Sequence, residues 1–155
     1  MQISVKAAIV AGLVAGAVFL ALEMMLVMAA GMSPWGPPRM MAAMVMGEGV
    51  LPPPATFDFG IMAVAMAVHF AMAVILGFLF AALVGGRGLS FAAALGVGAV
   101  FGLAVYVFNF YVMTGVFPWF AMARNWNSII AHAVFGIILA LVYRQMTHHS
   151  TARTV

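Results

Sequence analysis

Long runs of apolar residues, interrupted by only a few polar ones, dominate this chain. Four runs stand out, at residues 5–30, 59–84, 89–116 and 127–143. Each is long enough to cross a bilayer as a helix, which takes about 20 apolar residues. The pattern predicts an all-α fold, a four-transmembrane-helix bundle.

The longest connection, residues 32–58, lies between the first two runs and holds most of the prolines. Pro37 and Pro38 suit the first turn of a helix, because proline fixes φ where no amide hydrogen is needed. Apolar residues then recur at helical spacing. We expect a short interfacial helix over 37–46, lying across one mouth of the bundle, and an extended stretch through the later prolines.

Composition agrees with a lipid-facing surface. Of the 155 residues, 67% are hydrophobic and only 6% are charged, whereas soluble domains carry roughly 25% charged residues. The first apolar run is too long for a signal-peptide core and lacks a clear cleavage site, so we expect a retained helix. The chain is interpreted as one membrane domain, residues 1–155, with a cytoplasmic tail from residue 144.

Charge and cysteine content exclude several function classes. A formal charge of +3 is too small for a nucleic-acid surface. The partners we expect are the lipid bilayer and a larger membrane complex or a homo-oligomer. Without cysteine the chain forms no disulfide or thiolate metal site. There is also no phosphate-binding glycine loop, nucleophile elbow or carboxylate pair for hydrolysis, so we expect no enzyme activity.

Basic residues near the ends of the runs predict the orientation. Four of them fall on one side of the predicted bundle and two on the other, which favours both termini in the cytoplasm. Three tryptophans fall at the opposite boundary, as in an aromatic belt. The basic residues are Lys6, Arg87, Arg144 and Arg153 on the first side and Arg39 and Arg124 on the second.

The same order of signals occurs twice. A GxxxG pattern opens the first and third runs, a polar residue follows, Gly-x-x-Pro-Trp ends the run, and a histidine lies in the next. This order predicts two parallel two-helix repeats, residues 5–84 and 89–143, related by an axis along the membrane normal. The glycines permit close helix approach. The matched pairs are Gly12 and Gly98, Glu23 and Asn109, and His69 and His132.

Four polar residues, Glu23, His69, Asn109 and His132, fall inside the runs at similar depth. A carboxylate at mid-bilayer costs roughly 2.5–3.5 kcal/mol on insertion scales, so we expect Glu23 to be protonated or hydrogen-bonded to a histidine. We predict one buried cluster of Glu23, His69 and His132 facing the bundle axis. The alternative is that these residues only join helices through hydrogen bonds, which we favour for Asn109.

Methionine supplies a second signal, with 15 residues in the chain. Met62, Met66 and His69 share one helical face, and thioether and imidazole groups both suit copper. The candidate metal ligands are therefore His69, His132, Met62 and Met66. Methionine also packs irregular apolar interfaces well, which is the reading we favour.

Two segments carry a resemblance to known proteins. They run from Gly31 to Met40, with the sequence GMSPWGPPRM, and from Gly47 to Asp58, with the sequence GEGVLPPPATFD. In these segments the chain resembles a group of small bacterial four-helix integral membrane proteins, some of which are labelled sodium:proline symporters. The resemblance covers most of the chain. It implies a multi-pass protein of the bacterial inner membrane and contributes no catalytic residues.

Three functions remain open at this point. The one we favour is an accessory or assembly subunit without catalytic activity of its own, because four short helices with few polar groups leave little machinery for catalysis. The second is a haem- or metal-binding module, in which His69 and His132 hold haem b or copper and Glu23 orients one imidazole. The third is a small proton- or cation-coupled transporter that uses the same three residues.

Overall fold

The computed structural model describes residues 3–84 and 87–151, and every element in this part of the chain is helical. The long helices are α1 (Val5–Ala29), α3 (Phe59–Val84), α4 (Phe91–Val107) and α5 (Trp126–Thr151). The short elements are α2 (Gly36–Met46), η1 (Glu48–Val50), η2 (Phe108–Val112), η3 (Met113–Gly115) and η4 (Pro118–Ala123).

Four of these helices are long and apolar enough to cross a bilayer, with the third span running from Phe91 through η3 to Gly115. The four-helix prediction is thus confirmed, with two shifts in boundary. The third helix begins at Phe91, where Ser90 accepts a hydrogen bond from the amide of Ala93 and caps it. The fourth continues past Tyr143 to Thr151, because no glycine or proline follows to end it.

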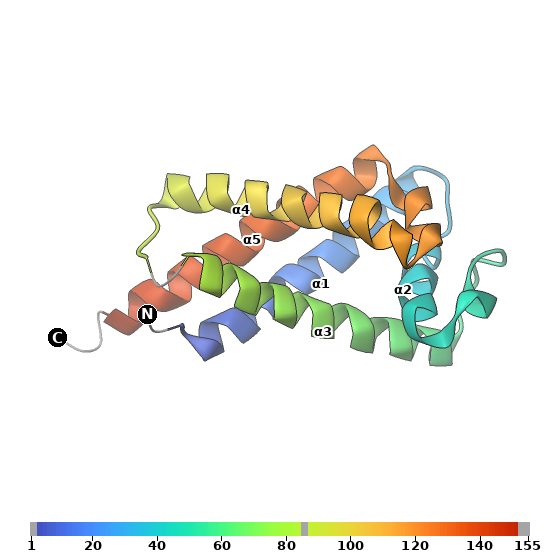
Figure 1. Cartoon of the computed structure of the whole chain (residues 1–155), viewed down its shortest axis with the longest axis horizontal. Helices are drawn as coiled ribbons and strands as arrows, with labels where there is room; N and C mark the ends of the chain where they lie inside the picture. The colour runs from blue at the N-terminus through green and yellow to red at the C-terminus, as the bar shows by residue number, and fades with distance from the viewer. Residues whose placement is uncertain (1–2, 85–86, 152–155) are drawn as a thin grey trace.

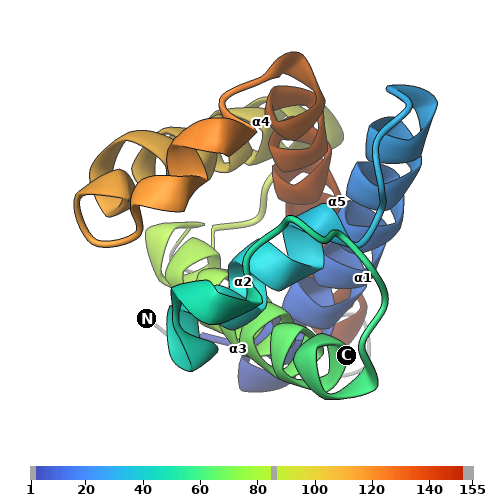
Figure 2. The ribbon, with the colours of Figure 1, turned by 90° about the vertical axis from the view of Figure 1, so that its right-hand side faces the viewer.

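The long helices lie side by side in the order α3, α1, α5, α4, as an open arc (Figures 1 and 2). The main helix contacts join α1 to α3, α1 to α5 and α4 to α5. The flanking helices α3 and α4 meet through the rings of Phe80 and Phe101, whose centroids lie 5.3 Å apart. The contact between α1 and α5 therefore joins the pair α1 and α3 to the pair α4 and α5.

The beginning of α1 and the end of α5 lie at one end of the bundle, called here the terminal end (Figure 1). The opposite end carries α2 and is called the α2 end. The core is at the terminal half, where Phe80 and Leu139 are fully buried among alanines and Tyr143. It fills the space between the helices there.

Small residues bring two helix pairs into backbone contact, as the GxxxG patterns predict. A Cβ atom added at Gly12 of α1 would lie 2.5 Å from the carbonyl oxygen of Ala73 in α3. A Cβ atom at Gly98 of α4 would lie 2.5 Å from the carbonyl oxygen of Gly136 in α5. The internal repeat stays a prediction. Gly12 and Gly98, which it pairs, each lie at one of these two helix contacts.

The predicted short helix is confirmed as α2, with proline in its first turn. It begins at Gly36 and ends at Met46, before Gly47 with a φ of 82°. It packs on α3 at the α2 end of the bundle (Figure 2). The connection after α2 thus returns to the bundle instead of extending away from it.

Candidate functional site

Glu23, His69 and His132 are all buried, with 7%, 8% and 4% of their surfaces exposed. They come from three different helices, α1, α3 and α5, and all three line one cavity. Their placement follows the predicted cluster. The contacts within it differ from those expected.

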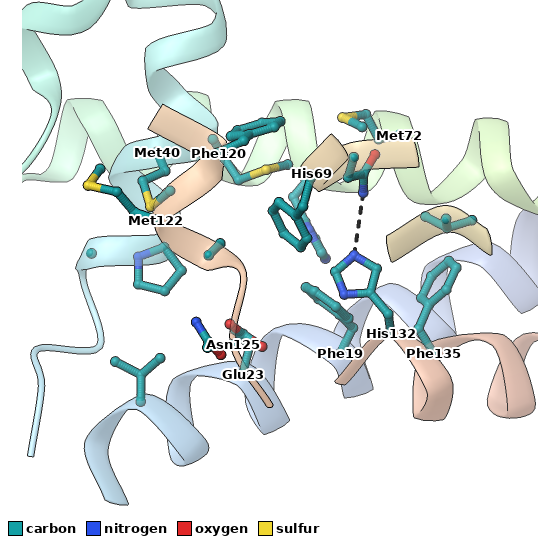
Figure 3. Close-up of a pocket in the computed structure, with 18 of the residues that line it drawn as sticks. Phe19, Glu23, Met40, His69, Met72, Phe120, Met122, Asn125, His132 and Phe135 are labelled. Atoms are coloured by element: carbon teal, nitrogen blue, oxygen red, sulfur yellow. Dashed lines mark hydrogen bonds between the residues drawn. The ribbon is translucent and has the colours of Figure 1, made fainter. Parts of the chain in front are cut away.

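A chain of hydrogen bonds begins at Glu23. The hydroxyl of Ser128 donates to Glu23 Oε1 at 3.0 Å. One turn further along α5, His132 Nδ1 lies 2.7 Å from the carbonyl oxygen of Ser128, and Asn109 Nδ2 lies 3.4 Å from His132 Nε2 (Figure 3). Because a carbonyl only accepts, Nδ1 of His132 carries the proton and Nε2 of the neutral ring accepts from Asn109. The chain joins α1, α5 and η2.

We expected Glu23 to be protonated or hydrogen-bonded to a histidine, and its hydrogen-bond partner is a serine instead. Ser128 is 1% exposed and faces α1, so its hydroxyl reaches the carboxyl group, while His132 one turn away turns toward Asn109. The other carboxyl oxygen, Oε2, is buried and has no hydrogen-bond partner within the described residues. The Glu23 side chain is therefore only half satisfied.

His69 is held separately, by the backbone of α1. Its Nε2 lies 2.9 Å from the carbonyl oxygen of Gly16 and donates to it. The ring of Phe19 contacts both imidazoles, with centroids 5.7 Å from His69 and 4.8 Å from His132. Each histidine thus donates to a backbone carbonyl and packs against the same aromatic ring.

The cavity has a volume of about 370 Å³ and is lined mainly by apolar side chains, among them methionines and phenylalanines (Figure 3). Toward the terminal end it stops at Leu76 and Phe135, where the core begins. Toward the α2 end it is bordered by residues of α2 and η4. Its polar lining side chains are Glu23, Ser33, His69, Asn109, Asn125 and His132.

The border at the α2 end is tied together by hydrogen bonds. Trp119 Nε1 of η4 donates to the carbonyl oxygen of Met40 in α2 at 3.0 Å. The buried guanidinium of Arg39 donates to the carbonyl oxygens of Thr56 at 2.8 Å and Val50 at 3.0 Å. These contacts hold α2 and the residues after it across this end of the bundle, where the sequence predicts the short helix to lie.

The segment that carries Asn109 departs from α-helical geometry. Element η2 is a π-helix, a form that is rare and often found at functional sites. Arg124 supports it, because its Nε donates to the carbonyl oxygen of Phe110 at 2.7 Å and its Nη2 to the hydroxyl of Thr114 at 3.1 Å. The widened turn places both Asn109 and Phe110 on the cavity.

The four candidate metal ligands do not line one common hollow. Met66 lines a second, smaller hollow of about 30 Å³ beside His69, between α1, α2 and α3. Met62 is buried, and it lines neither hollow. In the described ranges, no three His, Cys, Asp or Glu side chains are grouped closely enough to hold one metal ion.

A haem between the two histidines would meet aromatic side chains. Phe19 packs on both imidazoles, and His132 is also flanked by Tyr106 and Phe110, with ring centroids 5.6 and 5.3 Å away. Axial ligation through His132 Nε2 would also displace Asn109. The arrangement favours a compact ligand in the cavity over a macrocycle between the rings.

Sequence reasoning missed the roles of Arg39 and Ser128. Arg39 was read only as a basic residue for orientation, although an arginine among prolines and glycines is well suited to bind loop carbonyls. Ser128 lies four residues before His132, and this shared helical face is the signal that could have found it. No protein-family model, no curated protein and no solved structure matches the chain.

Proposed function

We propose that this chain is a small, non-catalytic membrane protein that holds a small amphiphilic molecule in the cavity between its four long helices. One observation carries the proposal: an apolar cavity of about 370 Å³ that contains a buried carboxyl group with one unpartnered oxygen. Ligand sites in proteins are typically concave, mostly apolar and marked by a few polar groups. The polar groups here gather at Glu23, Asn109 and His132.

Ligand binding without catalysis is one form of the accessory role that the sequence favours. A cavity that ends at a packed core suits a protein that holds a ligand more than one that conducts it across the membrane. The coupled transporter remains the second candidate, because Glu23 and both histidines line the cavity.

We also infer a bacterial inner-membrane location with both termini in the cytoplasm. The resemblance in the 31–40 and 47–58 segments supports the inner-membrane location. The excess of basic residues beside the terminal end of the bundle supports the orientation.

Thermal unfolding of the detergent-solubilised protein with a panel of cationic, neutral and anionic aromatic amphiphiles tests the binding function. A ligand that binds only the folded state stabilises that state by about 2.7 kcal/mol when its concentration is 100 times its Kd. We expect at least one class to raise the melting temperature of the wild type. In Ala123→Trp, whose new side chain fills the cavity, we expect the shift to vanish.

The matched control is Ala67→Trp, which places the same side chain on the exposed face of α3. This variant should respond to ligand as the wild type does. The proposal fails if no class of amphiphile stabilises the protein, or if Ala123→Trp and Ala67→Trp respond equally.

A further inference from the structure

We propose that the ligand of this cavity is an organic cation with an apolar body, and that this cation and a proton compete for the carboxyl group of Glu23. The inference rests on the proposed binding function and names its ligand class.

The charge of the lining is the first observation. Within residues 3–84 and 87–151, Glu23 is the single acidic residue that lines the cavity, and no lysine or arginine accompanies it. The two arginines at this end are engaged elsewhere, Arg39 with the carbonyls of Val50 and Thr56 and Arg124 with that of Phe110. An organic anion would therefore meet one acidic group and no counter-charge.

The unpartnered oxygen of Glu23 is the second observation. Ser128 occupies Oε1, and Oε2 is buried without a partner among the described residues. An ionised carboxylate in an apolar layer is costly unless a positive charge lies beside it. A bound cation supplies that charge, and when the cavity is empty of cation a proton neutralises the group.

Aromatic rings around Glu23 are the third observation. Phe19 lies one helical turn before Glu23 on the same face of α1, and Phe110 and Phe120 line the cavity with it. The faces of such rings attract cations, most strongly when the site is desolvated. The carboxyl group and the rings together suit a positive charge carried on an apolar body.

A hard divalent metal ion fits the same lining poorly. Such ions require six or more oxygen ligands, and among the described residues Glu23 is the only carboxylate on the cavity. Most of the remaining lining is carbon and thioether sulfur. The lining complements an organic ligand over most of its surface.

Competition with a proton follows from the single carboxyl group, because a protonated Glu23 no longer attracts the cation by charge. The other titratable groups that face the cavity are His69 of α3 and His132 of α5, and Tyr106 of α4 contacts His132. Elements α2, η2 and η4 contribute no titratable lining residue. Protonation of either histidine adds positive charge, so acid weakens cation binding through these groups as well.

Tetraphenylphosphonium and tetraphenylborate, which share size and shape and differ in charge, test the inference by equilibrium dialysis of the detergent-solubilised protein. We expect the wild type to bind the cation at least about tenfold more tightly than the anion, a difference of about 1.4 kcal/mol. Cation binding should weaken as the pH falls from about 8 to about 4, a range that spans the ordinary pKa values of imidazole and carboxyl groups.

Glu23→Gln should lose at least about tenfold in affinity for the cation, or about 1.4 kcal/mol, and the part of the pH dependence that the two histidines do not supply. Glu48→Gln is the matched control, because Glu48 is exposed in η1 outside the cavity. It should bind as the wild type does. Equal binding of the cation by the wild type and Glu23→Gln overturns the inference.

The charge selectivity of the wild type tests the inference even if Glu23→Gln does not fold. Equal affinity of the wild type for tetraphenylphosphonium and tetraphenylborate also overturns the inference. The outcome is separable from that of the proposed function. Neutral amphiphiles that stabilise the wild type and Ala67→Trp but not Ala123→Trp would keep the binding function and refute only the cationic ligand.

Discussion

The hydroxyl of Ser128 is the one described partner of the Glu23 carboxyl group, at 3.0 Å from Oε1. Ser128→Ala would leave both oxygens of Glu23 without a protein partner. Hydrogen bonds between membrane helices contribute about 0.6 kcal/mol on average and at most about 1.7 kcal/mol. We therefore expect Ser128→Ala to lower the free energy of unfolding by about 0.6–1.7 kcal/mol. Reversible unfolding in mixed micelles measures it.

A double-mutant cycle with Glu23→Gln separates this bond from other effects of the two substitutions. If the hydrogen bond links the residues, the double variant is less destabilised than the sum of the single variants. Strict additivity would show that Ser128 and Glu23 do not interact energetically.

The seams between helices depend on the absence of a side chain at particular glycines. Gly12→Ala places a methyl group 2.5 Å from the carbonyl oxygen of Ala73, and Gly98→Ala does the same at Gly136. Because both obstacles are backbone atoms, each variant should lose about 1–3 kcal/mol of stability, as overpacked cores do. Unfolding by sodium dodecyl sulfate measures the loss.

Gly96→Ala serves as the comparison on the same helix as Gly98, since nothing lies within 4 Å of the added atom. Alanine favours the helix over glycine by about 1 kcal/mol, so this variant should be as stable as the wild type or more so. A loss at Gly96 equal to that at Gly98 would contradict the packing argument.

For the whole molecule, the orientation can be read with single cysteines, because the natural chain has none. Gly49→Cys lies exposed near the α2 end, and Gly88→Cys lies exposed between α3 and α4 near the terminal end. We expect a membrane-impermeant maleimide added to intact cells to label Gly49→Cys only. Labelling of Gly88→Cys alone would reverse the topology, and labelling of both would contradict the four-span fold.

The sequence predicts the spans and α2 well, because their signals are local: the length of an apolar run, and prolines that open a helix. It also predicts the depth of Glu23, His69 and His132, since the rise per residue fixes depth. It does not predict their partners. Side chains such as Leu79 and Leu83 face outward and Phe80 faces inward, so apolarity cannot tell which face of these helices meets protein.

The order of the long helices, with α1 and α5 between α3 and α4, and the π-helix η2 depend on contacts between distant segments. Neither has a local signature in the chain. Both contribute to the lining of the cavity, so the cavity could not be predicted from the polar residues alone, although those residues mark its depth.

The central position of α5 has a consequence for how the protein is made. In chain order α1 is synthesised before α5, and α5 packs against both α1 and α4. Until α5 enters the bilayer, Glu23 lacks the hydroxyl of Ser128 and Asn109 lacks His132. A chain that stops before α5 therefore leaves an acidic side chain in lipid without its described hydrogen-bond partner.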